Sequence, residues 1–359
     1  MLCSLAETLV EYKAAPAEAR NEAVRLLCEA LDLFQRCLAI QETQYVAISE
    51  GGARDVNANS TEATMANLDS HTAQEDEDQE MYDVSVSDNA RWAIVRTPVT
   101  SSQILDTTLA QLEACAVLLQ LCADGRAEKP LSWVKSTAQT LLESKITPLS
   151  IETGRESEVA LAKANFEVSL GEAGFKAGSM DLLGWGTAIL SVFPNSSLGG
   201  AEFRELCDKA DAHIQLASAA VDSGDTAALN MGWRHYAFAA KSLSAAAKLQ
   251  PGKSRIHIAR GDVEMMRAKL NIPVAAESRD VLLKNAGVFY RGARRLEGEG
   301  GDARVVAEAA IKEAMVAYEG GDEGELLKKV QVGDIGRGVV VDAVDEGVFG
   351  PEWLERMDC

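Results

Sequence analysis

The chain has 359 residues with a formal net charge of −20; 47% of its residues are hydrophobic and 5% aromatic. A strongly acidic chain repels nucleic acid, and an apolar content made mostly of Ala, Leu and Val suits close-packed helices better than a β-sandwich. No run reaches the roughly 18–20 apolar residues of a membrane span, and the N-terminus lacks the basic region of a signal peptide. We therefore expect no direct contact with nucleic acid or membrane.

The N-terminal part, residues 1–48, is expected to form a helical hairpin. Apolar residues at helical spacing predict helices over 3–12 and 21–42, with Pro16 between them. From Ser49 this spacing disappears, and residues 49–92 hold 11 acidic against 2 basic residues. Such a composition buries too little apolar surface to offset the entropy of ordering, so the sequence predicts a long acidic disordered insertion.

The acidic insertion has two interpretations, a solubilising spacer or a binding segment for a basic partner. Closely spaced carboxylates attract Lys- and Arg-rich segments over long range. The candidate client-binding residues are Glu75, Asp76, Glu77, Asp78 and Glu80. Ser85 and Ser87 lie between acidic residues and are possible phosphorylation sites, where each phosphate would add roughly 1.5–2 negative charges.

Residues 93–330 are expected to be a series of helices. Thr100 to Ser102 read as the cap of a strong helix that ends at Asp124 and Gly125. The next helix is predicted to stop before Pro148, because proline disfavours a helical conformation at the preceding residue. The predicted helices that follow the first are 131–146, 156–176, 181–193 and 201–221.

The most regular stretch lies between Gly232 and Gly261. One face of a predicted helix carries Trp233, Tyr236 and Ala240, and Pro251 ends this helix. A second predicted helix, over 256–270, contains Gly261. Glycine inside a helix costs about 1 kcal/mol relative to alanine, so it usually marks close helix packing.

Spaced small and large residues in this stretch form a recurring pattern. The first copy consists of Ala239, Leu243, Ala246, Pro251 and Gly261; partial copies are Ala286, Tyr290, Ala293 and Ala30, Phe34, Cys37. This pattern resembles the tetratricopeptide (TPR) repeat, which implies helical hairpins stacked into a right-handed superhelix. The second copy begins 47 residues after the first rather than about 34. We therefore expect the first helix of that repeat to be extended, or to be followed by an insertion around 271–273.

The C-terminal third separates charge. Residues 251–296 hold 10 bases against 4 acids, whereas 297–359 hold 16 acids against 6 bases. Helices are predicted over 304–318 and 325–330, and the Gly- and Val-rich residues 331–359 are expected to break the helical pattern as a latch, a short strand or a tail. The candidate basic patch comprises Arg255, Arg260, Arg267, Arg291, Arg294 and Arg295. It has three interpretations: a site for an acidic peptide, a partner of the chain's own acidic segments, or a solvated face.

The sequence offers little support for catalysis. Ala247 to Ser254 satisfies a relaxed phosphate-loop pattern, but a helix rather than a strand precedes it, and Pro251 lacks one of the N–H donors. We interpret it as a turn between helices. Seven cysteines and four histidines show no metal-ligand spacing, so no catalytic, cofactor-binding or metal-binding residues are expected. Unpaired cysteines favour a reducing compartment, the cytoplasm or the nucleus.

The functional interpretation is a non-catalytic protein-binding scaffold. Its acidic segments favour a basic client, and the architecture resembles the TPR chaperones that escort ribosomal proteins or histones. An adaptor subunit of a larger assembly, with a hydrophobic partner, is the alternative. A nucleotide-binding enzyme is a third hypothesis, supported only by residues 247–254.

Overall fold

The computed structural model describes residues 17–55, 98–122, 131–193, 202–298, 301–321 and 333–357. All regular structure in these residues is helical, which confirms the all-α class. The helices of the first half are α2 (Ala17–Asp55), α3 (Ser101–Cys122), α4 (Leu131–Leu141), a π turn η1 (Leu142–Ile146), α5 (Thr147–Thr153), α6 (Glu156–Lys176) and α7 (Leu182–Val192). Those of the second half are α8 (Phe203–Ser223), α9 (Thr226–Leu249), α10 (Ser254–Ala268), α11 (Pro273–Glu297), α12 (Ala303–Glu319), α14 (Gly333–Asp345) and α15 (Glu352–Met357).

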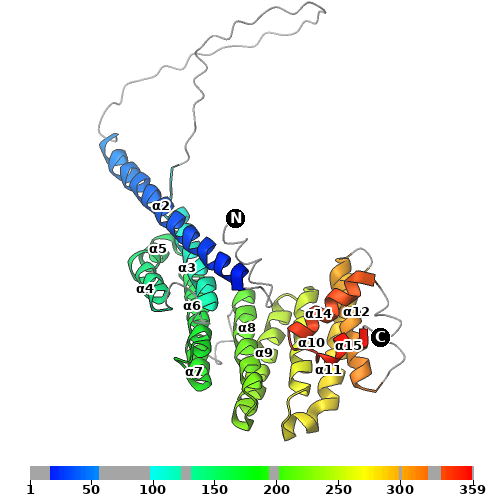
Figure 1. Cartoon of the computed structure of the whole chain (residues 1–359). Helices are drawn as coiled ribbons and strands as arrows, with labels where there is room; N and C mark the ends of the chain where they lie inside the picture. Colours follow the sequence, from blue (N-terminus) through cyan, green and yellow to red (C-terminus); the bar gives the residue numbers. More distant parts are fainter. Residues whose placement is uncertain are drawn as a thin grey trace, which may run out of the picture.

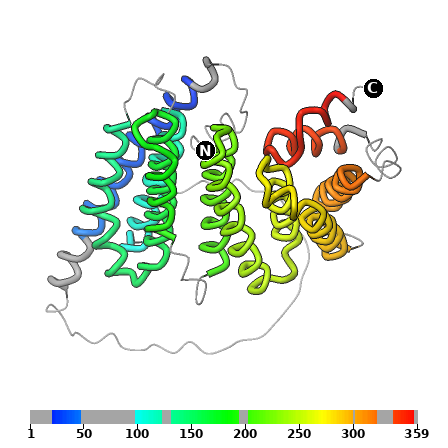
Figure 2. Tube along the Cα trace, turned by 90° about the horizontal axis from the view of Figure 1, so that it is seen from below, coloured from blue at the N-terminus to red at the C-terminus, as the bar shows by residue number. Residues whose placement is uncertain are grey.

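The helices stand side by side in a row that follows the chain. Figure 1 shows α3 to α7 at one end, α8 and α9 in the middle and α10 to α15 at the other end, with the long α2 running diagonally across the first group. Figure 2 shows the same order from below. One apolar core joins α2 to α6, a second joins α8 to α15, and a small third core around Trp185 and Ile189 links them through α6, α7 and α8.

The N-terminal boundary differs from the prediction. Helix α2 continues to Asp55, so residues 49–55 of the predicted acidic loop are helical. Gly51 and Gly52 cost about 1 kcal/mol each. They do not end the helix, because adding residues to an established helix is far easier than starting one. The predicted helices 3–12 and 325–330 lie outside the described residues.

The sequence predicted that the helix after residue 131 stops before Pro148, but the helix continues past this proline. It passes through the π turn η1 into α5. The backbone N–H of Thr147 donates to the Leu142 carbonyl oxygen, a longer step than in an α-helix. Pro148 then falls in the first turn of α5, where a missing N–H costs little.

Helices α8 with α9 and α10 with α11 form antiparallel hairpins. Asp225 caps α9 by accepting hydrogen bonds from two backbone N–H groups, and Gly224 has the positive φ of 73° that such a tight connection requires. The extra length of the second TPR-like copy lies neither in the first helix nor in an insertion at 271–273. It lies in the second helix, since α11 has 25 residues and begins with Pro273. Proline at the start of a helix is favourable, so Asn271 to Pro273 form a short connection.

The small and large residues of the two main copies lie where helices meet. Ala239, Ala286 and Tyr290 are buried in the core of the second half. Gly261 packs directly on Tyr290: a Cβ atom added to this glycine would lie 2.5 Å from Tyr290 Cε1. The N-terminal copy differs, because Ala30 is buried and Phe34 half-buried while Cys37 is exposed. Its third residue is therefore exposed, unlike the matching Ala246 and Ala293 of the two main copies, which are buried.

The C-terminal segment is helical rather than irregular, again unlike the prediction. Helices α14 and α15 bury Val340, Val348, Phe349 and Trp353 against the core that includes α12. The Trp353 Nε1 group donates to Glu319 Oε1 at 3.3 Å, and its ring meets those of Tyr318 and Phe349. The segment is thus a docked latch of two short helices.

The sequence analysis expected no segment apolar enough to span a membrane, and helix α3 differs from this expectation. It is long and apolar enough to cross a bilayer by length and composition. Just over half of its most apolar window, 56%, is buried inside the protein, and Leu105, Leu112 and Leu118 belong to the first core. Helix α3 is therefore buried to the extent expected of the central helix in a bundle of helices.

Candidate functional site

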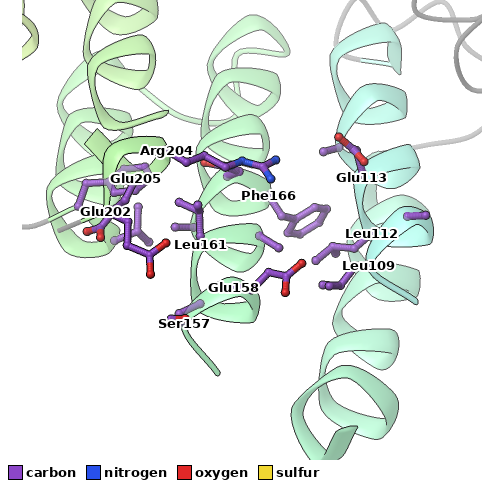
Figure 3. Close-up of a pocket in the computed structure, with 18 of the residues that line it drawn as sticks. Leu109, Leu112, Glu113, Ser157, Glu158, Leu161, Phe166, Glu202, Arg204 and Glu205 are labelled. Carbon is purple, nitrogen blue, oxygen red and sulfur yellow. The ribbon is translucent and has the colours of Figure 1, made fainter. Parts of the chain in front are cut away.

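A groove of about 850 Å3 lies between α3, α6 and the start of α8, as Figure 3 shows. Its floor is apolar and includes Leu109 and Leu112 from α3 and Leu161 and Phe166 from α6. Leu112 and Phe166 are buried in the cores, whereas Leu109 and Leu161 are only half-buried. The floor is therefore held rigidly from below and still offers apolar surface to a ligand.

Carboxylates surround this floor. Asp106 and Glu113 are seven residues apart on α3, which places both on the face that lines the groove. Five of the lining side chains are carboxylates: Asp106, Glu113, Glu158, Glu202 and Glu205. Arg204, which points from α8 toward α6 in Figure 3, is the single basic residue among the described residues of the lining, so these residues have a formal charge of −4.

Arg155 neutralises one end of the groove. Its guanidinium donates to Asp106 at 2.7 Å and to Glu158 at 2.7 and 2.8 Å. It also donates to the Ser102 hydroxyl at 3.0 Å, which ties the start of α6 to the start of α3. The two hydrogen bonds that Arg155 donates to Glu158 lower the pKa of this carboxyl. Asp106 and Glu158 are thus engaged within the protein.

The other three carboxylates have no arginine partner of this kind among the described residues. Glu113 and Glu202 form no ion pair with a described residue, whereas Glu205 lies one turn before Lys209 on α8 and favours the charged form of that lysine. Glu113 projects from α3, Glu202 directly precedes α8 and Glu205 lies in its first turn, so the three lie on opposite sides of the apolar floor (Figure 3). A Lys or Arg side chain placed between these walls would complete charge-assisted hydrogen bonds with them.

The sequence-predicted acidic residues cannot be compared with this groove. Glu75, Asp76, Glu77, Asp78, Glu80, Ser85 and Ser87 all lie outside the described residues. The groove itself was missed by sequence reasoning, because its carboxylates come from three helices that are distant along the chain. The spacing of Asp106, Leu109 and Glu113 on one face was the available signal.

Half of the predicted basic patch pairs with the chain's own acidic C-terminal segment. Arg291 Nε lies 2.9 Å from Glu313 Oε1, and Arg294 Nη2 lies 3.2 Å from Glu313 Oε2. Arg255 Nη2 lies 3.7 Å from Asp302 Oδ2. Of the interpretations offered by the sequence, the pairing with an acidic segment of the same chain accounts for these three arginines.

Two further arginines of the patch stack on aromatic rings. Arg260 Cζ lies 4.0 Å from the centre of the Phe289 ring, and Arg267 Cζ lies 4.3 Å from that of Trp233. Arg267 also pairs with Glu264 at 3.2 Å. Arg295 remains exposed. The six arginines are therefore dispersed over α10 and α11 in different environments.

The phosphate-loop match lies in the connection between α9 and α10. Helix α9 ends at Leu249, Pro251 and Gly252 form the turn, and Ser254 begins α10. The helix before the motif agrees with the predicted inter-helix turn and differs from the strand of a working phosphate loop. Within the described part of the chain, no group of three or more His, Cys, Asp or Glu residues could hold a metal ion.

A second hollow, of about 670 Å3, lies between α11 and α12. Val288 on its rim is exposed, and Val281 and Val274 continue the apolar stripe along α11 at intervals of seven residues. This stripe is an apolar surface without the acidic walls of the first groove.

Comparison with known proteins relates part of the chain to one protein. The chain is similar to the UPF0656 protein C926.02 of Schizosaccharomyces pombe, with 39% identity over 126 residues. The match covers 33% of this chain and 28% of that protein, well under two thirds of the relative's length. No family model matches the chain, and no solved structure matches it. The relative's name states no activity or partner.

Proposed function

We propose that the protein is a non-catalytic scaffold that binds a basic protein partner in the acidic groove of α3, α6 and α8. The observation that carries this proposal is the set of carboxylates Glu113, Glu202 and Glu205 around an apolar floor, of which Glu113 and Glu202 make no ion pair with a described residue. Opposite charge speeds the encounter, and apolar burial keeps a bound partner in place. The groove thus supplies both parts of a binding site for a Lys- or Arg-rich protein.

The finer architecture belongs to the same proposal. The hairpins α8–α9 and α10–α11, and the packing of Gly261 on Tyr290, support a TPR-like right-handed superhelix. Such stacked hairpins offer extended surfaces to partners. A chaperone or escort of a ribosomal protein or histone, acting in the cytoplasm or nucleus, fits a chain with this charge and an acidic groove.

The test is a kinetic binding assay with the basic partner purified together with the protein from native extract. In a variant with Glu113→Gln, Glu202→Gln and Glu205→Gln, association at 50 mM salt should slow about tenfold or more, because these charges steer the encounter. The matched control carries Asp32→Asn, Asp222→Asn and Glu277→Gln, three exposed carboxylates outside the groove lining. It removes the same charge and should associate like the wild type. Equal effects of both variants would assign the binding to overall charge and contradict the groove.

The adaptor-subunit alternative rests on a different surface. The stripe of Val274, Val281 and Val288 on α11 is 39%, 62% and 53% exposed, respectively. Apolar surface of this kind suits a partner that stays bound at high salt. Co-purification that survives 500 mM salt and is lost on Val281→Ser with Val288→Ser would favour this alternative.

A further inference from the structure

The shape of the acidic groove restricts the conformation of its ligand. On α3 the lining runs from Asp106 to Ala116, and on α6 from Ser157 to Phe166. At 1.5 Å per residue, each stretch is about 15 Å long, which equals about three turns of a helix laid alongside. The groove walls are themselves helices, so their ridges can receive those of another helix.

From this geometry, which rests on the proposed function, we propose that the groove binds an amphipathic α-helix of about three turns. The helix presents an apolar stripe to Leu109 and Leu161 and places Lys or Arg along both edges of the stripe. One edge then faces Glu113 on α3, and the other faces Glu202 and Glu205 on α8.

An extended peptide would fit the charges less well. Successive side chains of a strand point to opposite faces, so basic residues that alternate with apolar ones would point away from the floor rather than toward its two walls. A strand also requires hydrogen-bond partners for its backbone, and the described residues offer no sheet edge. A helix satisfies its own backbone groups and carries basic residues beside its apolar stripe.

Two designed peptides test this inference with the full chain. Both are fluorescently labelled 18-residue peptides of the same Leu and Lys composition, one ordered as an amphipathic helix and one shuffled to have no helical period. Fluorescence anisotropy at 150 mM salt should show that the amphipathic peptide binds at least tenfold more tightly. The variant with Glu113→Gln, Glu202→Gln and Glu205→Gln should weaken both peptides, because both carry the same charge.

A floor variant separates apolar docking from charge. Leu161→Ser removes a half-buried floor residue and should weaken the amphipathic peptide about tenfold while leaving the shuffled peptide unchanged. The matched control Leu183→Ser changes an exposed leucine outside the groove and should have no effect. Equal binding of the two peptides would overturn the helical ligand but leave the proposed function standing. Failure of both peptides to bind would overturn both, and tight amphipathic binding unaffected by Leu161→Ser would place the helix elsewhere and contradict the inference.

Discussion

Lys312 holds a buried charged cluster together in the second half of the protein. Its side chain is 2% exposed, and Nζ lies 3.0 Å from Asp262, 3.1 Å from Glu308 and 3.6 Å from Glu346. Burial alone would lower the pKa of Lys312, but the three carboxylates outweigh burial and raise it, so the lysine stays charged. The cluster joins α10, α12 and the segment between α14 and α15.

Replacing this lysine should therefore be costly. Lys312→Met leaves Asp262, whose side chain is only 15% exposed, with the 2.7 Å hydrogen bond donated by the Tyr290 hydroxyl in place of its ion pair. We expect a loss of about 3–5 kcal/mol in the free energy of unfolding, the usual effect of breaking a buried ion pair. Urea unfolding measures it, and adding Asp262→Asn should recover part of the loss. An unchanged urea midpoint in Lys312→Met would contradict this account of the cluster.

A buried histidine pair should make stability depend on pH. His213 Nδ1 lies 3.0 Å from His235 Nδ1, so one neutral ring donates to the other. Burial, aided by His235 and Lys209, lowers the pKa of His213 to about 3, and burial with Arg234 lowers that of His235 to about 4. Unfolded histidines titrate near 6.5, so below that pH the unfolded state binds more protons than the folded state.

The predicted sign follows directly: stability is complete above pH 6.5 and falls as the pH drops toward 4. Each histidine should lower the free energy of unfolding by about 2 kcal/mol as the pH falls from 6.5 to 5, at about 1.4 kcal/mol per pH unit. Urea unfolding at several pH values should show a weaker acid-side loss in the double variant His213→Gln with His235→Gln. His257→Gln, a change at a half-exposed histidine, is the control and should keep the wild-type slope. Identical slopes for all three proteins would show that the pair does not titrate as described.

At the scale of elements, the contact between α10 and α11 depends on one glycine. A Cβ at Gly261 would meet the buried Tyr290 ring at 2.5 Å, whereas a Cβ at Gly287 has its nearest neighbour, Val316 Cγ1, at 3.8 Å. Both glycines lie inside helices, and alanine gains about 1 kcal/mol of helix propensity at either. Gly261→Ala should nevertheless destabilise the protein by about 1–3 kcal/mol through overpacking, and Gly287→Ala should be neutral or stabilising. Urea unfolding of the two variants decides the point, and a Gly261→Ala protein as stable as Gly287→Ala would refute the close packing.

Helical periodicity alone predicted most of the fold. The prediction of 156–176 has the bounds of α6, and the small and large residues around Gly261 mark a real helix contact. The prediction was wrong at several glycines, which were expected to interrupt helices but lie inside them. Gly51 and Gly52 lie inside α2, and the three glycines near 333–338 belong to α14, which its valines bury against the body. Local preference is a weak guide at such positions because tertiary packing decides them.

The candidate site could not be predicted to the same extent. Its residues come from 106–116, 157–166, 192–193 and 202–205, and only the packing of α3, α6, α7 and α8 brings them together. The acidic insertion drew attention because its charges are adjacent in the sequence. Carboxylates at helical spacing, such as Asp106 and Glu113, are diluted among other residues and become a surface only in the folded protein.

At the scale of the whole molecule, the separation of charge along the sequence is partly cancelled in space. Basic residues of 251–296 pair with the acidic C-terminal segment, as Arg279 does with Glu319 at 3.1 Å and Arg291 with Glu313. These ion pairs neutralise some of the basic side chains of α10 and α11 and connect these helices to α12. In the groove of the first half, Glu113 and Glu202 make no ion pair with a described residue, which is the basis for proposing a basic ligand there.

Hydrogen exchange of the full chain, alone and bound to a basic protein that co-purifies with it, tests whether the acidic groove is the partner's site. On binding, we expect slower exchange in 106–116, 157–166 and 202–205, because these segments line the groove and would be covered. We expect no change along the exposed face of α11 from Val274 to Val288. Protection confined to α11, with the groove segments exchanging as in the free protein, would contradict the acidic groove as the partner's site.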